Sequence, residues 1–157
     1  MASSASSSAA SPLFLREEEI RRGIELLQFG HAALAAIMDP VLEREGIGRA
    51  HQRALYFIAR RPGLTVSALL RFLGITKQSL GRVLDELVER GLVEASPGLR
   101  DRRQRLLRLT SAGEAIETAL FDAMRERMAA AYSAAGQGSV TGFWRVLENL
   151  QHSEDQR

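Results

Sequence analysis

The chain has 157 residues, of which 45% are hydrophobic and 25% are charged, and its net charge is only +2. This length and composition are typical of one ordinary globular domain rather than of a disordered chain. The absence of Cys excludes disulfides and thiolate metal sites. No apolar run approaches the roughly 20 residues that a membrane-spanning helix needs, so we expect a cytoplasmic protein with no membrane partner.

The N-terminal segment MASSASSSAASP consists almost entirely of Ser and Ala. Such side chains bury too little area to offset the entropy of ordering the backbone, so we expect a disordered tail over residues 1–15. Residues 16–45 then carry apolar side chains at spacings of three and four, which predicts a long helix. Asp39-Pro40 interrupts this pattern and predicts either a kink or a restart with Asp39 as N-cap.

A helix-turn-helix is predicted in the middle of the chain. One helix is expected over residues 49–60, and Pro62-Gly63 is the signal that stops it. Thr65 caps a short helix over residues 66–72, Gly74 closes that helix, and Thr76 caps the next one. Two short helices joined by a tight turn that contains glycine are typical of this motif.

The helix predicted over residues 77–90 divides into an apolar and a polar face. Leu80, Val83, Leu84 and Leu87 recur at i, i+3, i+4 and i+7, which places them in the core. The other face carries Lys77, Gln78, Ser79, Gly81, Arg82 and Asp85. Gln and Arg are the side chains that read adenine and guanine edges with two hydrogen bonds, so this face is a candidate for DNA reading. The alternative is a solvated helix face.

Two short strands, residues 92–95 and 105–109, flank a basic turn with the sequence GLRDRRQR. The turn and the start of the second strand hold four arginines, Arg100, Arg102, Arg103 and Arg105. Their mutual repulsion at a hairpin tip would be relieved by the phosphates of a duplex, which predicts a DNA-binding wing rather than a merely solubilising loop. Residues 60–108 as a whole hold eleven basic and five acidic side chains, whereas the remainder is net acidic.

The last part of the chain predicts two further helices. Thr110 or Ser111 caps the first, with Ser111 and Glu114 at capping-box spacing, and Ser139 caps the second. These helices and the first one carry more apolar surface than a small winged domain can cover, which predicts burial against a second copy. The expected fold is mainly α, with a tail (1–15), an N-terminal dimerisation helix (16–48), a winged helix-turn-helix with a two-stranded β-hairpin wing (49–110) and C-terminal dimerisation helices (111–157).

From about residue 20 to residue 150 the chain resembles the multiple-antibiotic-resistance-regulator (MarR) family of winged helix-turn-helix transcriptional regulators. The most specific match is DRRQRLLRLTSAG. Its residues at the family's characteristic positions are Asp101, Arg103, Leu107, Leu109, Thr110 and Gly113. The stretch PGLTVSALLRFLGITKQSLGRVLDELVERGLV resembles the two central helices and the start of the wing. Gly81 departs from the pattern, because members often carry a polar residue there.

The resemblance implies a homodimer that binds a pseudo-palindromic operator in double-stranded DNA and regulates transcription, with repression the expected effect. It places Thr76, Lys77, Gln78, Ser79 and Arg82 in or beside the major groove. Arg103 would reach the minor groove, while Asp101 would orient the wing arginines, since a carboxylate repels phosphate. The resemblance also implies an anionic or aromatic small-molecule effector, whose identity the sequence does not reveal.

The sequence also bears on two other classes of function, interaction modules and enzymes. The same fold can serve as a protein–protein interaction module, which would have only non-specific affinity for DNA. An enzyme is not expected, because the sequence has no Gly-rich phosphate loop, nucleophile motif or paired acid–base residues, and we expect no cofactor. His31, His51 and His152 are too scattered in the sequence to predict a metal site.

Overall fold

The computed structural model describes residues 12–152. Its regular elements are η1 Leu13–Leu15, α1 Glu17–Glu45, α2 Arg49–Arg60, β1 Leu64–Thr65, α3 Val66–Leu73, α4 Lys77–Glu89, β2 Val93–Pro97, β3 Arg105–Leu109, α5 Ser111–Ala135 and α6 Gln137–His152. The chain divides into two compact units between Ala36 and Ile37. Residues 1–11 of the expected tail lie outside the described range, and Leu13–Leu15 form a single 3-10 turn.

The first unit contains η1 and the N-terminal part of α1. Three glutamates, Glu17, Glu18 and Glu19, occupy the first turn of α1, where negative charge complements the helix dipole. Apolar side chains of this segment are exposed in the isolated chain; they include Ile20, Ile24, Leu26, Leu27 and Phe29.

Helix α1 continues through Pro40 without interruption, so the predicted restart at Asp39 is wrong. Proline removes one backbone donor, and Ala36 and Pro40 are both exposed, so water can satisfy the carbonyl left without its partner. Asp39 instead forms an ion pair with Arg49 of α2, with 3.0 Å between Oδ1 and Nη2. Beyond Pro40, Leu42 is buried, so the C-terminal part of α1 packs within the second unit, to which it belongs.

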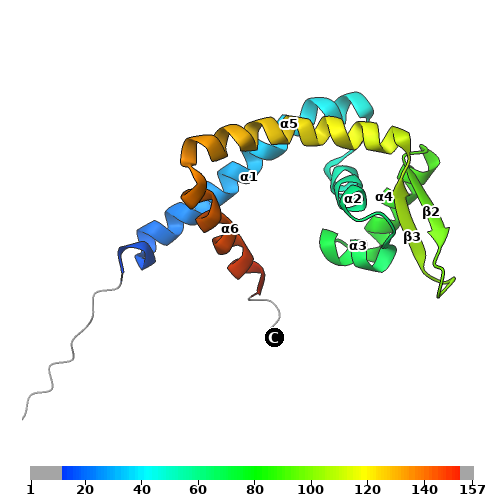
Figure 1. Ribbon diagram of the computed structural model, residues 1–157, viewed down its shortest axis with the longest axis horizontal. Coiled ribbons are helices and arrows are strands. Elements are labelled where there is room, and N and C mark those ends of the chain that lie inside the picture. The colour runs from blue at the N-terminus through cyan, green and yellow to red at the C-terminus, as the bar shows by residue number, and fades with distance from the viewer. Residues whose placement is uncertain (1–11, 153–157) are drawn as a thin grey trace, which may run out of the picture. The chain divides into compact units, whose positions relative to one another are not determined.

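The second unit is built around a small aliphatic core. Helix α2 packs against α3, α4 and α5, and Figure 1 shows α2, α3 and α4 gathered beside the sheet near the start of α5. The fully buried large side chains come from four helices (α2, α3, α4 and α5) and two strands (β2 and β3) of this unit, and include Leu55, Ile58, Leu69, Leu80, Leu87, Val93, Leu107 and Leu120. The expected inward face of α4 is confirmed, since Leu80, Val83, Leu84 and Leu87 are all buried.

The sheet has three antiparallel strands in the order β1-β3-β2, one more than the predicted hairpin. Strand β2 pairs with β3 in the register Val93↔Leu109 to Pro97↔Arg105. Strand β1 is only two residues long and pairs Leu64 with Leu107. Two residues cannot show a strand periodicity, so only the pairing with β3 reveals this element.

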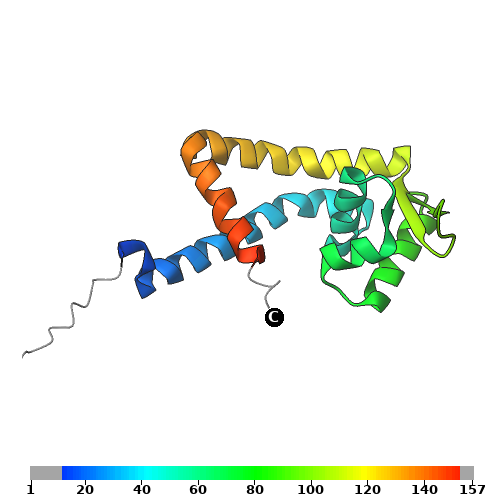
Figure 2. The ribbon, with the colours of Figure 1, turned by 60° about the horizontal axis from the view of Figure 1, so that its bottom comes forward.

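Helices α5 and α6 form a helical hairpin, which Figure 2 shows as a sharp turn at the end of α5. Thr110 caps α5 by accepting a hydrogen bond from the Gly113 N–H at 3.1 Å. The predicted cap at Ser139 is wrong: α6 begins at Gln137, directly after Gly136 at φ 81°, and Ser139 lies within its first turn. Trp144 Nε1 donates to the Tyr132 hydroxyl at 3.0 Å and joins the two helices. Over residues 12–152, no helix combines the length and apolar character needed to span a membrane.

The start of α5 makes a close contact that only glycine permits, and this contact can be tested. A Cβ on Gly113 would overlap the Leu92 carbonyl, which also accepts a hydrogen bond from Thr110 N–H at 3.1 Å. We expect Gly113→Ala to lower the free energy of unfolding by about 1–3 kcal/mol or more, because backbone must move to relieve the overlap. The matched control is Gly81→Ala in α4, where a Cβ meets no described atom within 4 Å. This change should add up to about 1 kcal/mol through helix propensity. Thermal and denaturant unfolding would measure both, and equal effects would contradict the close contact.

Candidate nucleic-acid interface

The turn between α3 and α4 is held by local side-chain caps. Thr65 Oγ1 accepts from Ala68 N–H at 3.1 Å and begins α3. Gly74 ends α3 in the left-handed region at φ 60°, a conformation that glycine adopts without a steric penalty. Thr76 Oγ1 then accepts from Ser79 N–H at 3.1 Å and begins α4, as the sequence predicts. These contacts fix where the polar face of α4 begins.

The polar face of α4 is open to solvent at the positions singled out from the sequence. Thr76, Lys77, Gln78, Ser79 and Arg82 are all exposed. Two of them are partly engaged, because the Thr76 hydroxyl donates to Ser79 Oγ at 2.8 Å within the cap. Among the described residues, no hydrogen-bond or ion-pair partner is found for Lys77, Gln78 or Arg82. These three side chains are therefore available to a ligand.

A compact turn forms the tip of the β2–β3 hairpin. Gly98 N–H donates to the Gln104 carbonyl at 2.8 Å, and Gln104 N–H donates to the Asp101 carbonyl at 3.1 Å. Gly98 is buried, and a Cβ there would lie 2.6 Å from the Asp101 carbonyl oxygen. Asp101 Oδ1 accepts from the Arg103 backbone N–H at 2.9 Å. The contact of Asp101 is thus to the backbone of the turn rather than to a guanidinium.

The wing arginines surround this turn, and within residues 12–152 their guanidinium groups have no partner. Arg100, Arg102, Arg103 and Arg105 are exposed, and none of them pairs with a carboxylate of the described residues. In both views the hairpin tip projects away from α2 (Figure 1, Figure 2). The result is a concentrated positive charge on a hydrogen-bonded frame, which suits a polyanion.

Sequence reasoning did not single out Leu99, which lies at the same tip and is 99% exposed. Its signal was present in the sequence as one aliphatic residue within an otherwise polar and basic turn. Proteins that enter the minor groove often place an apolar side chain beside their arginines, so the residue type fits this surface.

Two groups of DNA-binding candidates therefore belong to one compact unit. The polar face of α4 presents hydrogen-bonding side chains, and the wing presents positive charge. Gly91, at φ 67°, follows α4 and leads into β2, so a single short connection links the two. The arrangement offers hydrogen bonds to base edges from a helix together with charge for phosphates from a hairpin.

Comparison with known proteins identifies the family to which this unit is similar. Residues 45–104 match the model of the MarR family. The HTH-type transcriptional regulator PetP of Rhodobacter capsulatus is 50% identical over 138 residues, which cover 88% of this chain and 83% of PetP.

Solved structures share the fold. NadR in complex with 4-hydroxyphenylacetate is 26% identical, with a TM-score of 0.72 over 81% of this chain and 89% of NadR. Staphylococcal (S. aureus) MepR in its DNA-binding conformation is 19% identical, with a TM-score of 0.69 over 84% of this chain and 97% of MepR. The identity to PetP, which extends over most of both chains, shows that this protein belongs to the MarR family of helix-turn-helix transcriptional regulators and is not an enzyme.

Proposed function

We propose that this regulator represses transcription by binding, as a homodimer, a pseudo-palindromic operator in double-stranded DNA. The observation that carries the proposal is the set of four exposed wing arginines without partners in the described chain, in the same unit as a helix on which Lys77, Gln78 and Arg82 also have no partner among the described residues. A dimer seated on a promoter excludes other proteins from the same stretch of duplex, which makes repression the simplest outcome. Its relative PetP comes from the bacterium Rhodobacter capsulatus. Because bacterial chromosomal DNA lies in the cytoplasm, we place the protein there.

The proposed contacts follow the chemistry of each side chain. Gln78 and Arg82 read base edges in the major groove, because they offer paired hydrogen-bonding groups. Thr76, Lys77 and Ser79 lie at the N-terminal end of α4, where backbone N–H groups and the helix dipole favour phosphate. Arg103 enters the minor groove, and the remaining wing arginines, Arg100, Arg102 and Arg105, hold the backbone. In the proposed organisation, residues 49–110 bind DNA and the helical segments 16–48 and 111–157 form the dimer.

The dimer is supported by apolar surface that one chain leaves uncovered. On α6, Phe143, Trp144, Val146 and Leu150 are 41–60% exposed. On α1, Ile20, Ile24 and Leu27 are 44–52% exposed. Burial of such faces against the same faces of a second copy removes them from water at about 25 cal/mol per Å².

An anionic aromatic effector is part of the proposal. The solved structure of NadR contains 4-hydroxyphenylacetate, and that of PcaV from Streptomyces coelicolor contains its natural ligand. In this chain Phe57 and Phe72 stack at 5.1 Å, and the Arg61 guanidinium lies 4.6 Å from the Phe72 ring centroid. A cation beside aromatic faces is the chemistry that an aromatic carboxylate would use.

Alanine variants of Arg82 and Arg103 distinguish recognition of bases from electrostatic attraction to the DNA backbone. We expect Arg82→Ala to weaken the preferred site by about 1–3 kcal/mol while affecting random DNA much less, because a guanine contact is lost. Arg103→Ala should weaken preferred and random duplexes by similar factors and reduce the slope of log affinity against log salt by about one. Binding titrations at several salt concentrations measure both effects.

The matched control for both variants is Arg127→Ala on α5, an exposed arginine outside residues 49–110 whose loss removes the same charge, and light scattering must show that this variant remains a dimer. Circular dichroism should show a native fold in all three. If the wild type binds DNA weakly and without sequence preference, the chain is instead a protein–protein interaction module. Folded Arg82 and Arg103 variants that bind like the control would reject the proposed DNA-binding surface.

Asp101 can be tested with a pair of substitutions that remove the same negative charge. Asp101→Asn keeps an oxygen that can accept from Arg103 N–H, whereas Asp101→Ala loses it. One such hydrogen bond contributes about 0.5–1.5 kcal/mol, so the Ala variant should bind DNA up to about tenfold more weakly than the Asn variant. Its Arg103 amide should also exchange hydrogen faster. Equal affinities would show that Asp101 does not orient the wing.

The two-fold geometry predicts a dependence on helical phase. Half-sites read by two copies of α4 must lie about one turn, roughly 10 base pairs, apart on the same side of the duplex. Inserting five base pairs between the half-sites should reduce affinity to that of a single half-site, measured by titration. The same five base pairs inserted outside the half-sites provide the control. Tight binding to the lengthened site would reject the two-fold dimer.

A further inference from the structure

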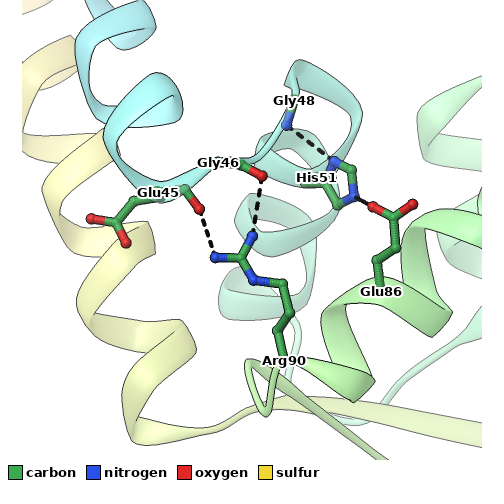
Figure 3. Close-up of polar contacts among 6 residues, drawn as sticks. All are labelled: Glu45, Gly46, Gly48, His51, Glu86 and Arg90. Atoms are coloured by element: carbon green, nitrogen blue, oxygen red, sulfur yellow. Dashed lines mark hydrogen bonds and ion pairs between the residues drawn. The ribbon is translucent and has the colours of Figure 1, made fainter.

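Arg90 joins the C-terminal end of α4 to the C-terminal end of α1. Its Nη2 donates to the Glu45 carbonyl at 2.6 Å and its Nη1 donates to the Gly46 carbonyl at 3.2 Å. Figure 3 shows the guanidinium reaching both oxygens at once. Helix α1 ends here with Gly46 at φ 62°, so these carbonyls have no partner within the helix. A planar guanidinium that spans two acceptors fixes a direction as well as a distance.

His51 makes a second link, between the same part of α4 and the beginning of α2. Gly48 N–H donates to His51 Nδ1 at 3.2 Å, and His51 Nε2 lies 2.6 Å from Glu86 Oε2 (Figure 3). Because a backbone N–H can only donate, Nδ1 must accept and the proton must reside on Nε2, from which it bonds to the carboxylate. The His51 side chain is only 15% exposed, so water competes weakly for this contact.

The charges of this corner also match the helix ends that they meet. Arg90 places a cation at the C-terminal end of α1, and Glu86 places an anion beside the first turn of α2, which has no acidic residue of its own. Both placements are favourable with respect to the helix dipoles. We call Glu86, Arg90 and His51 the corner clasp, since together they fasten the end of α4 to the ends of α1 and α2.

The corner clasp lies at the end of α4 opposite the residues proposed to read bases. Thirteen residues of α helix span about 20 Å. A tilt of about 10° at the clasp would move the other end by about 3–4 Å, which matches the rise of about 3.4 Å per base pair along a strand. The apolar contacts of Leu80, Val83, Leu84 and Leu87 are non-directional, so they resist such a tilt less specifically than hydrogen bonds do.

We infer that the corner clasp is a positioning device: Glu86, Arg90 and His51 set the angle of α4 against α1 and α2 and thereby set which separation of half-sites the dimer accepts. This inference rests on the proposed function, in which α4 reads DNA and α1 contributes to the dimer. None of the three residues needs to touch DNA. Their effect is on the geometry of two lobes rather than on the affinity of one.

A charge-neutral double variant tests the corner clasp. Glu86→Ala combined with Arg90→Ala removes one negative and one positive charge, so the electrostatic attraction to DNA is unchanged. The control is Glu89→Ala combined with Arg127→Ala, two exposed residues for which no partner is found among the described residues. Neither is among the residues proposed to contact DNA or among the apolar residues proposed to cover the dimer, and light scattering must show that both double variants remain dimers. The probes are duplexes that carry the half-site selected by the wild type from a random pool, either singly or as pairs whose separation varies in steps of one base pair.

The control should keep the sharp optimum in separation expected for the wild type. The clasp variant should bind the best pair about tenfold more weakly than the control, while pairs one base pair longer or shorter change by less than about threefold. Its affinity for a single half-site and for random DNA should stay within about twofold of the control. The distinguishing result is a flattened separation profile, which a mere loss of stability would not produce.

Each other outcome rejects the inference in a recognisable way. An unchanged profile in a folded variant overturns the corner clasp alone, as does a uniform loss at every separation and for single half-sites. A wild type that selects no half-site, or shows no preferred separation, overturns the proposed function and the clasp with it.

Should the double variant fail to fold, nitrogen chemical shifts of the wild-type histidines provide an independent check. His51 must show the Nε2–H tautomer, and the Nδ1–H tautomer would overturn the geometry. The single variant Glu86→Ala then replaces the double variant in the DNA series, with Glu89→Ala as its control.

Discussion

Burial of four aliphatic side chains along one side of α4 is the constraint on which the DNA-binding surface depends. The core of the second unit buries Leu80, Val83, Leu84 and Leu87. Because these residues lie on one face of α4, the opposite face must be exposed to solvent. The caps at either end limit how far the helix extends. Which side chains are presented to a duplex is therefore decided by packing on the other side of the helix.

The distribution of ion pairs separates structural arginines from those left for a ligand. Arg21, Arg44, Arg49 and Arg125 each lie within 3.0 Å of a carboxylate, although these surface pairs contribute little to stability. Arg90 donates to backbone carbonyls instead. The wing arginines have neither kind of partner in the described chain, and a frame of backbone hydrogen bonds holds them at one tip. Binding of an external polyanion such as DNA would relieve the electrostatic repulsion among these arginines, and for this reason the wing is central to the proposed function.

Much of this molecule follows from its sequence because the governing interactions are local. The bounds of α2 and β3, the threonine caps of α3 and α4, and the buried stripe of α4 agree with the sequence patterns. Caps act within three residues and amphipathic stripes repeat within one helix, so both are visible as short-range patterns in the sequence. The candidate DNA-binding residues follow from the sequence in the same way, because residue type and position on a helix face or turn are also local properties.

Other features were decided only by tertiary structure. Strand β1 forms because Leu64 pairs with Leu107, more than forty positions away in the sequence. Helix α1 can continue through Pro40 because that side of the helix is exposed to water. The corner clasp joins His51 to Glu86 and Arg90 to Gly46, pairs that no sequence spacing relates. Sequence by itself determined the six long helical segments, the two longer strands, the threonine caps and the chemistry of the exposed face of α4, since these depend on neighbours along the chain. Tertiary structure decided which elements are fastened to one another and at what angle, because those contacts form only when distant segments meet.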